Sequence, residues 1–212
     1  DLPGHGKSEG KSKLSIDEYS NDIIDFLDAM DLKKVCLVGH SMGAAIALNA
    51  SLSRHWRICS AVAIGGASKM VVNHAILQGL QNSFEATVNS IVRYSWHKKT
   101  GAVAGSERMA AYFREKAKQR MLDAGSKTVH GDFLACSNFD LSERLEEIGV
   151  PVLVIASDGD RMVPLKVSQK MAEKLPNAEF VSLENCGHFQ HIEQTAKVAG
   201  ELVTFLSKLR NT

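Results

Sequence analysis

Residues 35–45, VCLVGHSMGAA, place a serine between a short apolar run and a run of small residues. The apolar run stops at Gly39, and the small-residue run predicts a helix that begins beyond Ser41. The G-x-S-x-G pattern of residues 39–43 is typical of a tight strand-to-helix turn, which leaves the serine hydroxyl exposed at the carboxyl end of a sheet. We therefore predict that Ser41 is a nucleophile.

Two glycines and one backbone N–H are expected to support this turn. Gly39 and Gly43 would leave room where a Cβ would collide with the neighbouring strand or helix. The N–H of Met42, at the start of the helix, would donate to a developing oxyanion. The alternative is a chance pentapeptide in a Gly/Ser loop, but strand and helix patterns flank the turn on both sides.

The composition is that of an ordinary globular domain with room for an insertion: 212 residues, 44% hydrophobic, 23% charged and a formal net charge of +1. This charge balance gives no indication of a nucleic-acid partner, and no apolar run approaches the roughly 20 residues that span a bilayer. The ligand expected is a small-molecule substrate. The oligomeric state stays open.

The four cysteines are scattered and lack the spacing of a metal site or a disulfide framework. They predict buried free thiols in a reducing, cytoplasmic compartment, with no metal and no cofactor: Cys36, Cys59, Cys136 and Cys186.

Short apolar runs alternate with amphipathic patterns along most of the chain. Strands are expected at residues 35–38, 60–66, 151–156 and 179–183, and helices at 16–30, 44–52, 141–148, 165–175 and 193–209. This alternation predicts an α/β fold: a mostly parallel sheet with helices on both faces and right-handed crossovers. The run at 35–38 is unpatterned, which is typical of a strand that is buried on both faces.

Residues 69–136 differ in character from the rest of the chain. They show helical patterns at 71–80, 84–94 and 107–122, separated around Gly101 and Gly105, and no convincing strand. We interpret them as a helical lid, inserted between two strands of a core formed by residues 1–68 and 137–212. The Met, Phe, Tyr and Trp96 side chains suit an apolar cover over a site, although an ordinary helical layer would show the same pattern.

Two polar loops follow the later strands and supply the other groups that a nucleophilic serine needs. A triad requires a base that takes the serine proton and an acid that orients the base. Asp158 and Asp160 follow one strand and His188 follows the next, which gives the chain order Ser, Asp, His. Either aspartate could orient His188. The Asp-Gly-Asp trio looks faintly like a calcium loop, but the further oxygen ligands are missing.

Four stretches together resemble the α/β-hydrolase superfamily and span almost the whole chain. Residues 130–134 with 138–140 also resemble the return from lid to core in small-molecule hydrolases of that family. The four stretches are DLPGHGKS at 1–8, GHSMG at 39–43, D-x-x-V-P at 160–164, and GHF at 187–189 with a following Glu193.

The resemblance implies a role for several of these residues. Ser41 would be the nucleophile, Asp160 the orienting acid and His188 the general base, with the N–H of Met42 in the oxyanion hole. The family spacing before the Val-Pro pair favours Asp160 over Asp158. Of the other histidines, His5 would belong to the opening loop, His191 follows the family histidine, and His40 would point away from the site.

The resemblance also concerns the start of the chain. In the family, the stretch at residues 1–8 follows the fourth strand of an eight-stranded sheet, so four strands are expected here. The first strands and the loop that donates the second oxyanion N–H would be missing, as in a fragment of a longer hydrolase; a natural minimal form is the alternative. The strand at 35–38 would then become an exposed sheet edge.

These observations predict a serine hydrolase. It would cleave a small apolar carboxylic ester, thioester or lactone through an acyl-enzyme on Ser41. The same triad could also serve a carbon–carbon bond hydrolase or a perhydrolase. A non-catalytic binding protein of the same fold is the competing class.

Overall fold

A computed structural model of the chain describes residues 1–53, 56–98 and 106–210. Their centre is one sheet of four strands, in which every neighbouring pair is parallel and the spatial order is β1-β2-β3-β4. The predicted α/β class and the four expected strands are therefore confirmed. The strands are β1 (Val35–His40), β2 (Ile58–Ile64), β3 (Val152–Ser157) and β4 (Ala178–Leu183).

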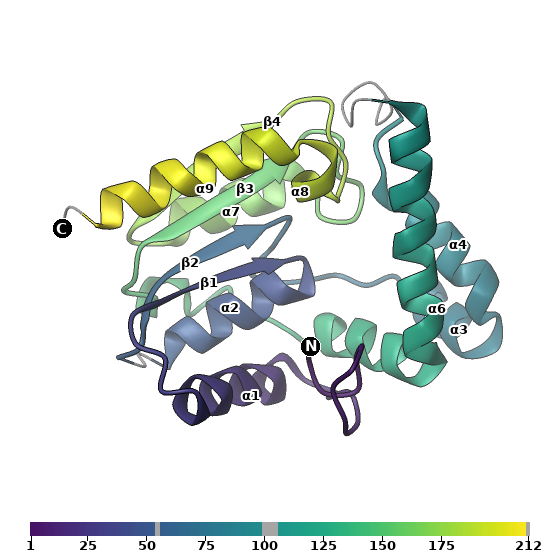
Figure 1. Cartoon of the computed structure of the whole chain (residues 1–212), viewed down its shortest axis with the longest axis horizontal. Helices are drawn as coiled ribbons and strands as arrows, with labels where there is room; N and C mark the ends of the chain where they lie inside the picture. The colour runs from purple at the N-terminus through teal and green to yellow at the C-terminus, as the bar shows by residue number, and fades with distance from the viewer. Residues whose placement is uncertain (54–55, 99–105, 211–212) are drawn as a thin grey trace.

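Helices cover both faces of the sheet (Figure 1). Alternate residues of the central strands point to opposite faces, so Ala63 and Val154 join one apolar cluster while Ile64 and Ile155 join another. The first cluster lies against α1 (Ile16–Ala29), α2 (Met42–Leu52) and α7 (Leu165–Lys174), and the second against α9 (Thr195–Leu209).

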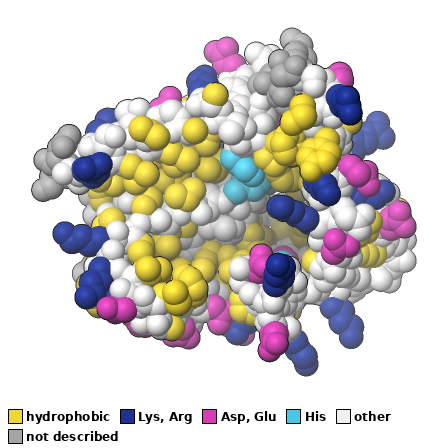
Figure 2. Space-filling view, in the orientation of Figure 1, with side chains coloured by type: hydrophobic (Ala, Val, Ile, Leu, Met, Phe, Trp, Pro, Cys, Tyr) yellow, Lys and Arg dark blue, Asp and Glu magenta, His cyan; other side chains and the backbone are white. Residues whose placement is uncertain are grey.

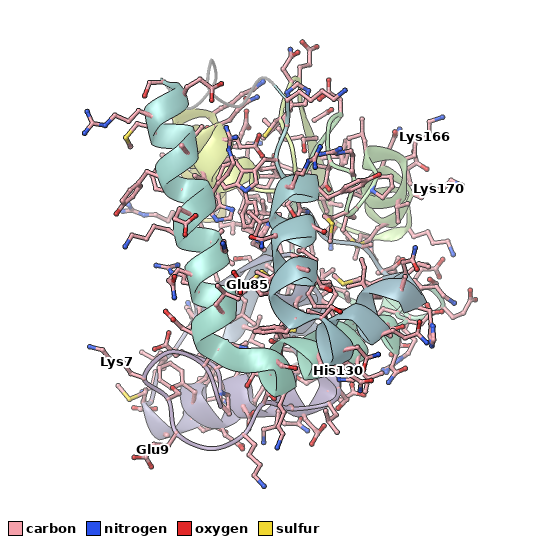
Figure 3. All side chains as sticks on the ribbon, turned by 90° about the vertical axis from the view of Figure 1, so that its right-hand side faces the viewer. Lys7, Glu9, Glu85, His130, Lys166 and Lys170 are labelled. Carbon is pink, nitrogen blue, oxygen red and sulfur yellow. The ribbon has the colours of Figure 1, made fainter. Side chains whose placement is uncertain are left out.

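Among the described residues, three helices lie beyond the carboxyl ends of the strands, at the right of Figure 1: α3 (His74–Asn82), α4 (Phe84–Ser95) and α6 (Glu107–Ser137). They share a third apolar cluster, which includes Leu80, Val88 and Val129. Gly125, at φ 83° and ψ 159°, interrupts α6. The second part of α6, which carries His130, then runs in a new direction (Figure 3).

Several predicted elements differ from the observed ones. The helix predicted at 71–80 begins only at His74, and the one predicted at 107–122 continues to Ser137. Only a 3₁₀ turn, Leu145–Glu147, forms within 141–148, where Leu141 instead bonds to the Ser68 carbonyl. The closing helix is divided into α8 (Gln190–Glu193) and α9, because Gln194 is non-helical. Gly101 and Gly105 lie outside the described residues.

Two burial predictions are wrong in part. Val38 is 53% exposed, because β1 has only one neighbour in the described sheet and is not covered on both faces. Cys59 is exposed and Cys36 is half-buried, whereas Cys136 and Cys186 are buried; all four are free thiols. Within the described residues, no helix combines the length and apolar character that crossing a membrane requires.

Candidate active site

Ser41 lies at the tip of a sharp turn between β1 and α2. Its backbone is left-handed, with φ 54° and ψ −117°, and its N–H donates to the carbonyl of Ile64 at 2.9 Å. A Cβ on Gly39 would overlap the backbone carbonyl of Gly43, which is the kind of collision predicted for a side chain at position 39. The same prediction for Gly43 is wrong, because a Cβ there would meet no atom within 4 Å.

The structure brings Ser41, His188 and Asp160 into one line of hydrogen bonds. Ser41 Oγ lies 2.9 Å from His188 Nε2, and His188 Nδ1 lies 2.8 Å from Asp160 Oδ2. A carboxylate can only accept, so Nδ1 carries the proton and Nε2 is left to accept the serine O–H. His188 and Asp160 are 4% and 5% exposed, which shields this line of bonds from water.

Asp160, and not Asp158, contacts the histidine. Its Oδ1 accepts the N–H groups of Met162 and Val163, both at 2.8 Å. Its Oδ2 accepts from His188 and Gln190, so four donors surround the carboxylate. Asp158 Oδ1 instead accepts the N–H of Cys186 at 3.4 Å. Of the two candidate aspartates, Asp160 is therefore the one in contact with the His188 ring.

Gln190 is a site residue that the sequence analysis missed. Its side chain is fully buried, and its Nε2 donates to Asp160 Oδ2 at 3.1 Å and to Ser157 Oγ at 3.0 Å. A glutamine two positions after the histidine carries no local signal of this role, because its partners lie 30 and 33 positions away.

The sequence predicted that His40 would point away from the site, but its ring lies against His188. Its Nε2 donates to the backbone carbonyl of His188 at 2.7 Å, and the two rings lie 4.7 Å apart. Burial, with a smaller contribution from neighbouring histidines, holds the pKa of His40 well below its ordinary value. The ring centres of His191 and His40 lie 4.6 Å apart, and burial lowers the pKa of His191 as well. His5, as predicted, belongs to the opening loop.

Met42 is the first residue of α2 and directly follows Ser41. The first N–H groups of a helix have no acceptor one turn earlier, and together they favour negative charge. Figure 2 shows the site from outside: histidine side chains lie at the centre of this face, beside a hollow, between the sheet and the helical group.

Comparison with known proteins gives consistent results. The model of the alpha/beta hydrolase fold family matches residues 1–195. The uncharacterized hydrolase YugF of Bacillus subtilis is 26% identical over 97% of this chain and 78% of its own length, and a putative carbamate hydrolase RutD of Agrobacterium fabrum is 27% identical over 97% and 80%. A solved thermophilic esterase is 29% identical, covers 98% of this chain and 79% of its own, and superposes with a TM-score of 0.85.

Proposed function

This chain belongs to the α/β-hydrolase family and is an enzyme of the hydrolase class, and we propose that it is a serine hydrolase acting on small carboxylic esters, thioesters or lactones. The observation that carries the proposal is the unbroken hydrogen-bond line from Ser41 through His188 to Asp160. This arrangement supplies a nucleophile, a base and an acid that orients the base.

The chemistry follows from the geometry of these three side chains. His188 Nε2 takes the proton of Ser41 as the Oγ attacks the substrate carbonyl carbon. Asp160 stabilises the imidazolium that forms, and the N–H of Met42 faces the new oxyanion. The tetrahedral intermediate collapses as His188 protonates the departing oxygen or sulfur. Water, deprotonated by His188, then releases the acyl group and restores Ser41.

We infer from the helical group that the substrate is apolar. We propose that residues 69–136 form a lid over a core of residues 1–68 and 137–212. The apolar cluster of α3, α4 and α6 extends to Met162 and Phe189, which are close neighbours of Asp160 and His188 in the chain. A substrate at Ser41 would therefore meet apolar walls on the side of these helices.

A fluorophosphonate probe, which phosphonylates activated serines, tests the proposal. The wild-type chain should be labelled once, and Ser41→Ala or His188→Ala should abolish labelling. Ser51→Ala is the matched control, because Ser51 lies buried in the same helix and its hydroxyl donates to the Ala47 carbonyl, away from the site. Its labelling should equal that of the wild type.

Two outcomes would contradict the proposal. Labelling that survives Ser41→Ala would exclude Ser41 as the nucleophile, and a folded wild-type chain that is never labelled would favour a non-catalytic binding protein. A panel of esters, thioesters and lactones with increasing acyl length then separates the substrate classes by kcat/KM. The putative carbamate hydrolase among the relatives makes a carbamate a useful addition to that panel.

A further inference from the structure

The loop that carries His188 is fastened to the end of α4. The backbone N–H of His188 donates to the carbonyl of Ser95, the last residue of α4, at 2.7 Å. The ring of Trp96 stacks on that of Phe189, with centroids 4.9 Å apart and an interplanar angle of 26°. Residues 93–97, which we call the α4 end, therefore contact the histidine loop through the Ser95 carbonyl and the Trp96 ring.

The same α4 end also contacts the loop that carries Asp160. Arg161 donates to the carbonyls of Arg93 and Trp96, both at 3.2 Å, and its guanidinium lies 4.2 Å from the centre of the Tyr94 ring. A Cβ on Gly159 would overlap the ring of His97, so the loop and the α4 end are in close contact there. The α4 end thus joins the two loops that hold the acid and the base.

Glu193 holds this junction together from inside. Its side chain is 1% exposed, and its Oε1 accepts the N–H groups of Gly187 at 3.1 Å and Phe189 at 3.3 Å. Its Oε2 accepts the N–H of His97 at 3.1 Å. One carboxylate therefore binds both chain neighbours of His188 and the α4 end. A buried carboxylate is costly unless it is hydrogen-bonded, so these donors are a condition of its burial.

We propose that Glu193 is a positioning residue, which sets the orientation of His188 toward Ser41 by tying the histidine loop to the α4 end. The position of α4 then controls the alignment of the base. The inference rests on the proposed function, because it takes the Ser41–His188 hydrogen bond as the reacting pair. A misplacement of about 1 Å can cost on the order of 100-fold in rate, so small movements of α4 are sufficient.

The test uses Glu193→Gln in a chain that also carries Trp56→Phe. The sequence holds two tryptophans, so Trp96 becomes the only one. Trp96 is 3% exposed and Trp56 64%, which makes Trp96 a reporter of the docked α4 end. The glutamine amide puts an N–H group where one carboxylate oxygen accepts a backbone N–H. We expect fluorophosphonate labelling to slow about 10- to 100-fold. Trp96 emission should shift to longer wavelength and become more accessible to acrylamide.

If Glu193 only stabilised the fold, Glu193→Gln would behave like a substitution that merely destabilises the core. Leu145→Ala, in the same Trp56→Phe chain, is the destabilised control, because Leu145 is buried in the core away from both loops. It should lower the melting temperature while labelling and Trp96 emission stay at the parent values. Glu193→Gln that labels at the parental rate, or labels slowly with unchanged Trp96 emission, would overturn the inference.

A second variant covers the case in which Glu193→Gln does not fold. Trp96→Leu removes the stack on Phe189 and leaves the Glu193 carboxylate in place. Labelling should slow about 10-fold, within the range expected for a misaligned base, and an unchanged rate overturns the inference. A parent chain that is not labelled at all would instead refute the proposed function, and the two failures are thereby distinguished.

Discussion

Ser41 combines an unfavourable backbone conformation with the position of the nucleophile. A non-glycine residue at φ 54° and ψ −117° lies outside the ordinary regions, and such a residue costs about 1–3 kcal/mol unless its surroundings hold it. Two contacts hold it here: its N–H on the Ile64 carbonyl, and the close approach of Gly39 to the Gly43 carbonyl. The turn is therefore maintained by backbone contacts on both sides of the serine.

The two glycines of the turn should respond in opposite ways to alanine. Gly39→Ala forces a Cβ into the Gly43 carbonyl, so we expect a loss of about 1–3 kcal/mol in the free energy of unfolding and a strong loss of probe labelling. Gly43→Ala, whose Cβ meets open space inside α2, should stabilise the chain by up to about 1 kcal/mol. Urea unfolding measures both. Equal destabilisation by the two variants would show that the steric argument is wrong.

Strand β1 is the edge of the described sheet. Val38 is 53% exposed on this strand, and Val203 of α9 is 65% exposed. Figure 2 shows hydrophobic side chains gathered over the left half of the face that it views. An exposed apolar edge strand is a template for pairing with another chain, because its outer N–H and C=O groups have no strand partner.

Charge placed on this edge should reduce self-association. We expect Val38→Lys to lower the fraction of aggregate that the purified chain forms at high concentration, since a charged side chain on an edge strand opposes pairing. Light scattering against concentration measures the effect. Val71→Lys is the control, because Val71 is 85% exposed but lies outside the sheet. An equal gain from both variants would attribute the effect to net charge alone.

At the scale of the whole molecule, Asp132 joins segments that are far apart in the chain. Its Oδ2 lies 2.8 Å from His5 Nε2 in the opening loop, and its Oδ1 accepts the hydroxyl of Tyr19 in α1 at 2.6 Å. Asp132 belongs to the second part of α6, so these bonds hold the helical group against α1 and the opening loop (Figure 3). The hydrogen bond to Asp132 raises the pKa of His5.

The raised pKa of His5 makes this contact dependent on pH. Its stabilisation is fully present below the ordinary pKa of about 6.5 and is lost as the pH rises through the higher value of the folded state. His5→Gln should therefore reduce the free energy of unfolding more at pH 5.5 than at pH 9, as measured by urea unfolding at each pH. His74→Gln, at an exposed histidine outside this contact, is the control for a general effect of losing a histidine. A penalty for His5→Gln that is independent of pH would contradict the argument.

The sequence by itself determined the fold class, the four strands, and Ser41 and His188 of the three residues proposed for catalysis; it favoured Asp160 over Asp158 only through the family spacing. These depend on short-range patterns: each strand is an apolar run, and each polar loop follows directly after one. Two finer predictions were wrong: a continuous closing helix, and burial of the first strand on both faces. The divided closing helix depends on Gln194, and the exposure of Val38 depends on which strands lie beside β1.

Only the tertiary structure decided which polar groups meet. Asp158 and Asp160 are equivalent in a strand-loop pattern, and the choice between them depends on the His188 ring, 28 positions away from Asp160. The contact of His40 with the His188 carbonyl spans 148 positions, and that of Glu193 with His97 spans 96. Hydrogen bonds require partners within about 3 Å, and the chain pattern carries no information on distances of that size between remote segments.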